Sequence, residues 1–107
     1  MIDWARVEEL ISDLGKDDFR EIVDMFLSEV EDRIEGLDQS DHTQFLEDLH
    51  FLKGSTNNLG FTAVGVMCVL AENAPKPNSA AEISDCYQKS KQAFMLGLDR
   101  MSITRSD

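Results

Sequence analysis

His50 is followed, one helical turn later, by Lys53 and Gly54, and these three residue types together could support chemistry at a single place. They belong to the segment LEDLHFLKGSTNNLG, which reads as one helix, although a glycine inside a helix costs about 1 kcal/mol relative to alanine. Residues three and four apart lie on the same side of a helix, so Lys53 and Gly54 are both neighbours of His50. Neutral histidine offers a nucleophilic ring nitrogen. The spacing therefore indicates a nucleophile with a cation beside it and open space next to it.

The helix that carries these residues places its apolar side chains on another face. Its apolar stripe consists of Phe45, Leu49, Leu52, Thr56 and Leu59. At about 100° per residue, His50 projects roughly 125° away from the centre of that stripe, so we expect it to face outward. Lys53 falls between the stripe and His50, so its stem can pack on the protein while its ammonium reaches toward the imidazole.

An outward histidine with a neighbouring cation is suited to accepting a phosphoryl group. The ring nitrogen would attack phosphorus while Lys53 offsets the charge on the transferring oxygens. The missing side chain at Gly54 would leave room for a large partner. From the residues alone an alternative stays open, in which His50 is an ordinary surface histidine, Lys53 a solvated charge and Gly54 a tolerated defect.

Two helices are predicted before this segment. Asp3 can cap a short helix that runs to about Leu14, where Gly15 offers a left-handed stop. From Asp17 to about Leu37, apolar residues recur every three or four positions among charged ones, which indicates a long amphipathic helix. A solvated face is expected for its acidic residues, among them Glu29, Glu31 and Asp32.

Two further helices are predicted after the His50 helix, which Ser40 or Asp41 can cap and Gly60 closes. Thr62 is expected to cap the first of them, and the prolines of NAPKPNS break the chain before Ser79 starts the last. That last helix should bury Ile83, Tyr87, Ser90, Phe94, Gly97 or Leu98, and Met101. Short connections favour antiparallel neighbours. We therefore predict an all-α fold, an antiparallel up-and-down four-helix bundle with a short extra N-terminal helix.

Length and charge exclude several classes of function. The 107 residues fit one domain spanning 1–107. A net charge of -11 disfavours binding to nucleic acid or to an anionic membrane surface. No apolar run approaches the roughly 20 residues of a membrane span, and MIDWARVEEL does not read as a signal peptide, so we expect a cytoplasmic protein. Cys68 and Cys86 form no CxxC pair and are expected to be reduced, buried core residues.

The segment HFLKGSTNNLG resembles the signature of histidine-containing phosphotransfer (HPt) domains, in which the phosphorylated histidine is followed by Leu-Lys-Gly-Ser and later by Leu-Gly. The positions in register are His50, Leu52, Lys53, Gly54, Ser55, Asn58, Leu59 and Gly60. The likeness continues into VGVMCVLAE, at Val64, Met67, Cys68 and Glu72. Two positions depart from the pattern, because Phe61 stands where alanine is common and Ala71 where leucine is common. We expect Phe61 to alter the packing or the apolar rim that a partner touches.

The resemblance implies a phosphorelay carrier that is neither a kinase nor an ATPase. His50 would take a phosphoryl group on Nε2 from an aspartate of one response-regulator receiver domain and pass it to another, with Lys53 next to the phosphoryl group. Gly54, Leu46 and Asn57 would contribute to the receiver docking surface, although Asn57 also fits a merely solvated residue. No cofactor is implied for the chain, because Mg²⁺ would come with the receiver. A hybrid histidine kinase is a further candidate partner, and we expect a monomer.

Two other functions stay open on the sequence. A helical adaptor would bind receivers without carrying phosphate, but such a degenerate domain is expected to have lost His50 or Lys53. A metal-binding bundle needs paired Glu-x-x-His motifs, whereas EDLH occurs once and His42 is isolated. ATP chemistry has no support, because neither a Gly-rich phosphate loop nor an acidic Mg²⁺ cluster is present. Since the chain begins at Met1 with no preceding module, we expect a free-standing shuttle rather than a fragment of a hybrid kinase.

Overall fold

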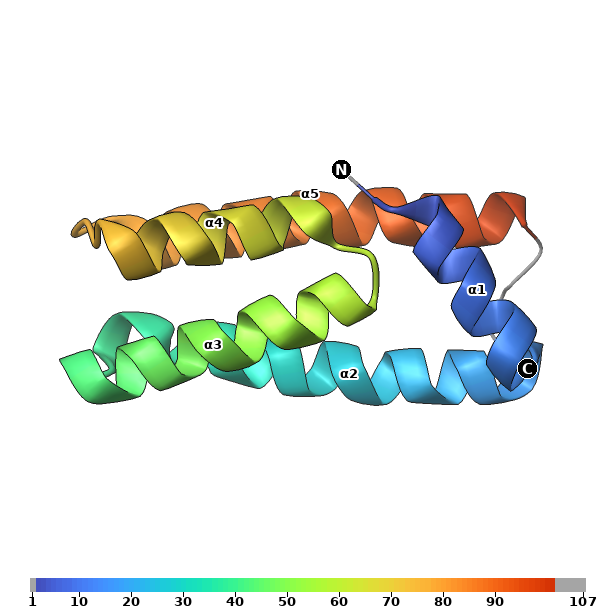
Figure 1. The fold of residues 1–107 in the computed structure, drawn as a ribbon, viewed down its shortest axis with the longest axis horizontal. Helices are drawn as coiled ribbons and strands as arrows, with labels where there is room; N and C mark the ends of the chain where they lie inside the picture. The colour runs from blue at the N-terminus through green and yellow to red at the C-terminus, as the bar shows by residue number, and fades with distance from the viewer. Residues whose placement is uncertain (1, 102–107) are drawn as a thin grey trace.

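The computed structural model describes residues 2–101, and four long helices packed side by side dominate it (Figure 1). The elements in chain order are α1 (Trp4–Leu14), α2 (Lys16–Gly36), the 3-10 turn η1 (Leu37–Gln39), α3 (His42–Asn58), α4 (Thr62–Asn73) and α5 (Ser79–Arg100). Helices α2 to α5 run alternately up and down, and α1 crosses one end of the bundle (Figure 1). The predicted all-α antiparallel bundle with an extra N-terminal helix is confirmed.

Local signals in the sequence set the ends of the helices. Asp3 caps α1 by accepting a hydrogen bond from the Arg6 amide at 3.2 Å, and Asp41 caps α3 by accepting one from the Gln44 amide at 2.8 Å. Gly60 follows α3 with φ of +87°, and a Cβ atom there would lie 2.8 Å from the Asp3 carbonyl oxygen. The turn between α3 and α4 therefore requires glycine for both its backbone conformation and its close packing.

The structure corrects the predicted cap of α4 and the predicted burial at the end of α5. Phe61 rather than Thr62 holds the N-cap position of α4, and Thr62 is the first helical residue. In α5 the chain buries Leu98, whereas Gly97 and Met101 are only half-buried. Gly97 has another use, because an added Cβ would overlap the Trp4 ring, which stacks on Phe94 at 6.1 Å between centroids. The glycine thus lets α1 sit close to α5.

Phe61 belongs to the core and not to a surface that a partner could touch. Its side chain is 0% exposed, and its ring centroid lies 5.0 Å from that of Phe94 and 6.0 Å from that of Tyr87. The expectation of an effect on packing holds, but the expectation of a contact with a partner is wrong. The tight turn at Gly60 directs this side chain inward between α4 and α5.

One acidic residue of α2 departs from the predicted solvated face. Glu31 accepts a hydrogen bond from the Tyr87 hydroxyl at 2.6 Å and one from Lys91 Nζ at 2.5 Å, both on α5. Partial burial would raise the pKa of Glu31, but these hydrogen bonds outweigh it and hold the pKa below its usual value. The Glu31 carboxylate therefore links α2 and α5, the two longest helices of the bundle.

The two cysteines were expected to be reduced and buried, and only one of them is buried. Cys68 is buried and free, and burial, aided by the nearby Glu72 charge, raises the pKa of its thiol to about 12. Cys86 is also free but only half-buried, because it lies at the edge of the apolar face of α5. Within residues 2–101, none of the helices has both the length and the apolar composition needed to cross a membrane.

Candidate functional site

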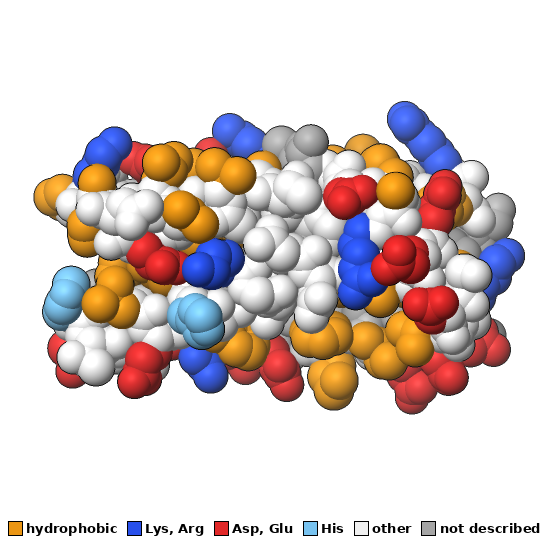
Figure 2. Space-filling view, in the orientation of Figure 1, with side chains coloured by type: hydrophobic (Ala, Val, Ile, Leu, Met, Phe, Trp, Pro, Cys, Tyr) orange, Lys and Arg blue, Asp and Glu red, His pale blue; other side chains and the backbone are white. Residues whose placement is uncertain are grey.

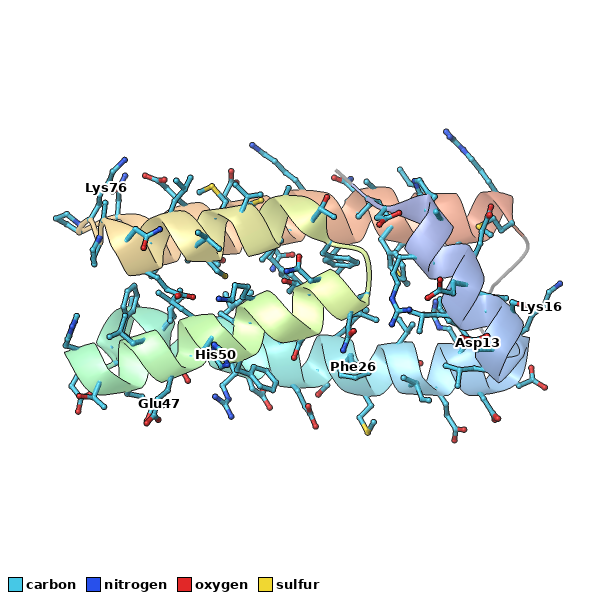
Figure 3. The ribbon with its side chains drawn as sticks, in the orientation of Figure 1. Asp13, Lys16, Phe26, Glu47, His50 and Lys76 are labelled. Atoms are coloured by element: carbon cyan, nitrogen blue, oxygen red, sulfur yellow. The ribbon has the colours of Figure 1, made fainter. Side chains whose placement is uncertain are left out.

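His50 points away from the core on the middle of α3, as the periodicity predicts (Figure 3). The orientation follows from its neighbours, because Leu49 and Leu52 are both 0% exposed and fix which side of the helix faces inward. The imidazole is exposed, so a second protein can reach a ring nitrogen without any rearrangement of the bundle. An accessible, neutral ring nitrogen is the requirement for a nucleophile that reacts with another macromolecule.

Gly54 leaves open space next to His50. A Cβ atom built at Gly54 meets nothing within 4 Å, whereas the same test at Gly60 meets backbone. Packing within this chain therefore gives no reason for a glycine here, even though glycine lowers the stability of a helix interior. The clearance predicted from the sequence is present.

Lys53 lies one turn from His50, and its ammonium is directed at α4. Its Nζ is 3.6 Å from Glu72 Oε1, with the two side chains 32% and 28% exposed. This distance exceeds that of a charge-assisted hydrogen bond, and Glu72 Oε1 is buried without any hydrogen-bond partner. The expectation that the ammonium reaches toward the imidazole is thus incomplete, because a carboxylate on the neighbouring helix attracts it.

Glu72 is an unusual partner for an ion pair that serves stability. It lies in the last turn of α4, where the negative end of the helix dipole opposes a carboxylate. Its buried oxygen gains no hydrogen bond in exchange for the loss of water. Partly exposed ion pairs contribute little to stability in any case. The contact of Lys53 with Glu72 is therefore a long ion pair without a hydrogen bond.

The other two predicted site residues lie on the same helix in different surroundings. Asn57 is exposed, about two turns beyond His50, and its amide rests against Gly65 of α4, where a Cβ would overlap it. The glycine at position 65 thus leaves room for this amide. Leu46, one turn before His50, is half-buried and packs against the core. The structure brings both onto the helix that presents His50.

A group of residues around Asp48 was not predicted. Asp48 is only 4% exposed, and its carboxylate accepts hydrogen bonds from Arg33 Nη1 at 3.0 Å, Gln44 Nε2 at 2.9 Å and Ser40 Oγ at 3.2 Å. The Arg33 guanidinium also lies over the ring of Phe51, 4.3 Å from its centroid. The sequence did carry a signal for this group. Asp48 lies at the edge of the apolar stripe, and a carboxylate buried there needs hydrogen-bond donors from other elements.

The EDLH segment does not continue into a set of metal ligands. Glu47 is exposed, while Asp48 is bound to Arg33. Among residues 2–101, no three His, Cys, Asp or Glu side chains come together in an arrangement that could hold a metal ion. The arrangement at His50 is that of an exposed imidazole with a cation one turn away.

Comparisons with known proteins agree in pointing to one family. A model of the Hpt domain family matches residues 21–102, which include α3, α4, α5 and most of α2. The phosphorelay intermediate protein YPD1 of Candida albicans is 34% identical over 79 residues, an alignment that covers 68% of this chain and 43% of the yeast protein. The chain thus spans less than half the length of this curated relative. No solved structure matches the chain.

Proposed function

Because the chain belongs to the Hpt domain family, we propose that it is a histidine phosphotransfer protein of a two-component phosphorelay that carries the phosphoryl group on His50. The observation that carries the proposal is the exposed imidazole with Lys53 one turn along the helix and open space at Gly54. The partners would be response-regulator receiver domains, and a hybrid histidine kinase would supply phosphate through its own receiver. The chain would be a carrier and not an ATP-dependent kinase.

The transfer step needs one nucleophilic atom from this chain. The Nε2 lone pair of neutral His50 attacks the phosphorus of an aspartyl phosphate on the receiver. The N–P bond forms as the bond from phosphorus to the aspartate oxygen breaks, and the aspartate leaves as a carboxylate with the bonding electron pair. The reverse step gives the phosphoryl group to an aspartate of a second receiver. Any Mg²⁺ that the reaction uses would be held by the receiver.

Lys53 would stabilise negative charge on the transferring group. The phosphoryl oxygens carry more charge than the single carboxylate of Glu72, and they would arrive on the side of α3 that His50 and Lys53 share. The ammonium would then exchange Glu72 for the phosphoryl group. The long Lys53–Glu72 contact supports this role, because the N–H donors of Lys53 make no hydrogen bond to Glu72 and stay available for phosphoryl oxygens.

The docking surface would extend around His50 on α3. Gly54 provides clearance, Leu46 an apolar contact and Asn57 a polar contact beside Gly65. Phe26 of α2 is half-buried on the same face of the molecule and adds apolar area (Figure 3). Such a mixed surface is typical of interfaces that form and separate repeatedly. The site is complete in one chain, so we propose that it acts as a single-domain monomer.

Transfer from phosphorylated receivers tests the proposal directly. Receiver domains of the source organism would be phosphorylated with acetyl phosphate and Mg²⁺, freed of the donor, and mixed with the chain. We expect acid-labile, base-stable phosphate on the wild type and on a His42→Gln variant, and none on His50→Gln. His42 is the matched control, because it is exposed on the same helix. Receiver binding without any transfer would refute the carrier function and support a non-catalytic adaptor.

A further inference from the structure

Helix α2 brings a second basic side chain to the surface around His50. The Arg33 guanidinium spans Asp48 and Phe51, the residues two positions before and one position after His50. It therefore borders His50 on the side of α2, while Lys53 borders it on the side of α4. Figure 2 shows Lys or Arg side chains on both sides of the histidine at the place where Figure 3 labels His50.

Two contacts hold the Arg33 guanidinium, one to the Asp48 carboxylate and one to the Phe51 ring. Asp48 is buried and accepts hydrogen bonds from Arg33 on α2 and from Gln44 on α3, while the Ser40 hydroxyl lies within reach of both Asp48 and the Gly36 carbonyl oxygen. The Phe51 ring supports the flat face of the guanidinium. A side chain that is already ordered loses less conformational entropy when it binds a partner.

Part of the Arg33 side chain stays available despite this anchor. The side chain is 43% exposed, while the Asp48 side chain that holds it is 6% exposed. Within the described residues, only its Nη1 has a hydrogen-bond acceptor, although a guanidinium has five N–H donors. The buried negative charge and the exposed positive charge form a dipole with its positive end outward.

The chemistry of the expected partner matches this arrangement. The reacting aspartate of a receiver would face His50, so the carboxylate that Arg33 binds has to be another acidic side chain beside that reaction site, and a planar guanidinium binds carboxylates through two parallel hydrogen bonds. The net charge of -11 makes a basic position the exception on this chain. Each of the two cations that flank His50 is paired with a carboxylate, Asp48 for Arg33 and Glu72 for Lys53, so the face is mixed in charge, and at Arg33 the positive group is the exposed one.

We propose that Arg33 is a specificity-determining residue that binds a carboxylate of the docking receiver domain, and that Asp48 and Phe51 hold its guanidinium in position for this contact. The inference rests on the proposed function, because that function supplies the receiver as partner. Arg33 acts on docking, whereas His50 and Lys53 act on the transfer step.

Receiver binding measured without chemistry tests this role. Isothermal titration calorimetry would compare His50→Gln with His50→Gln carrying Arg33→Gln, using each receiver domain of the source organism as the probe. We expect Kd to rise about tenfold on loss of a charged hydrogen-bonded contact, and the dependence of Kd on salt to weaken. Lys89→Gln is the matched control, because it removes one charge from an exposed ion pair on α5 and should leave Kd unchanged.

Transfer kinetics separate docking from chemistry. In wild-type background, Arg33→Gln should raise the receiver concentration needed for half-maximal transfer and leave the rate at saturating receiver unchanged. Equal Kd values for the Arg33→Gln and Lys89→Gln proteins would overturn the proposal, as would binding to no receiver. Arg33-dependent binding without any phosphotransfer by the wild type would instead refute the carrier function alone. If Arg33→Gln fails to fold, the double variant with Asp48→Asn removes the unpaired buried carboxylate and allows the same comparison.

Discussion

Two lysine–glutamate pairs on opposite sides of the bundle have similar exposure and different geometry. Lys91 and Glu31 are 34% and 40% exposed, and Lys53 and Glu72 are 32% and 28% exposed. The first pair is hydrogen-bonded at 2.5 Å and shares its carboxylate with the buried Tyr87, whereas the second stays at 3.6 Å without a hydrogen bond. Burial therefore does not explain the difference. Both pairs connect two helices, but only the first is hydrogen-bonded, and the second leaves the N–H donors of its lysine available.

The sharpest test of this comparison exchanges the two lysines for glutamine. Lys53→Gln should slow phosphotransfer about 100-fold, because one preorganised cation at a transferring group contributes on that scale, and should change the free energy of unfolding by less than about 0.5 kcal/mol. Lys91→Gln should lower stability and leave transfer unchanged. Rapid-quench transfer and urea unfolding measure the two effects. Equal effects of both variants on transfer would contradict the comparison.

The pair on α2 and α5 is expected to matter for stability only. Glu31→Gln should lower the free energy of unfolding at pH 7 by about 1 kcal/mol, because it weakens the hydrogen bonds from Tyr87 and Lys91 at a partly solvated site. Transfer rates should match those of the wild type. A loss of transfer with unchanged stability would show that Glu31 serves the site.

The contribution of Glu31 should also depend on pH in one direction. Its pKa in the folded chain lies below the ordinary value of 4.5, so the folded state favours the ionised form. The stability difference between wild type and Glu31→Gln should be fully present above about pH 4.5 and decline as the pH falls further. Urea unfolding of both proteins between pH 7 and pH 3 measures this. A difference that grows toward low pH would contradict the assignment.

The smallest expected effect comes from Glu72. Glu72→Gln removes the carboxylate that competes for Lys53 and repels a phosphoryl group, so the transfer equilibrium should shift toward phosphorylated His50 by about threefold. Stability should stay constant or rise slightly, because the lost charge opposed the dipole of α4. The ratio of phosphorylated carrier to phosphorylated receiver at equilibrium reports the shift. An equilibrium shifted toward the receiver would indicate that Glu72 supports the phosphorylated state.

The sequence was enough to predict the fold class and the direction of His50, because both depend on the period of apolar residues along single helices. It could not identify partners on other helices. Periodicity places Lys53 at the edge of a face, but the carboxylate that attracts it comes from α4. Arg33 and Asp48 lie 15 positions apart, and only the packing of α2 on α3 brings them together.

Phe61 shows a second limit of prediction from the sequence, which concerns the direction of a side chain after a turn. Its place beside a motif suggested contact with a partner, yet the direction of a side chain after a turn depends on the backbone angles of that turn. The positive φ of Gly60 and the inward course of the chain put the ring among Tyr87 and Phe94. Aligned motifs identify positions, and surroundings have to come from the three-dimensional arrangement.

The open space at Gly54 has a consequence for engineering. In the isolated chain, replacing Gly54 by a good helix former should raise the free energy of unfolding by up to about 1 kcal/mol, because a Cβ there meets no neighbour. A screen for thermostable variants would therefore discard this glycine early. Under the proposed function, bulkier replacements would hinder receiver docking, so selection in the presence of a receiver would preserve the glycine.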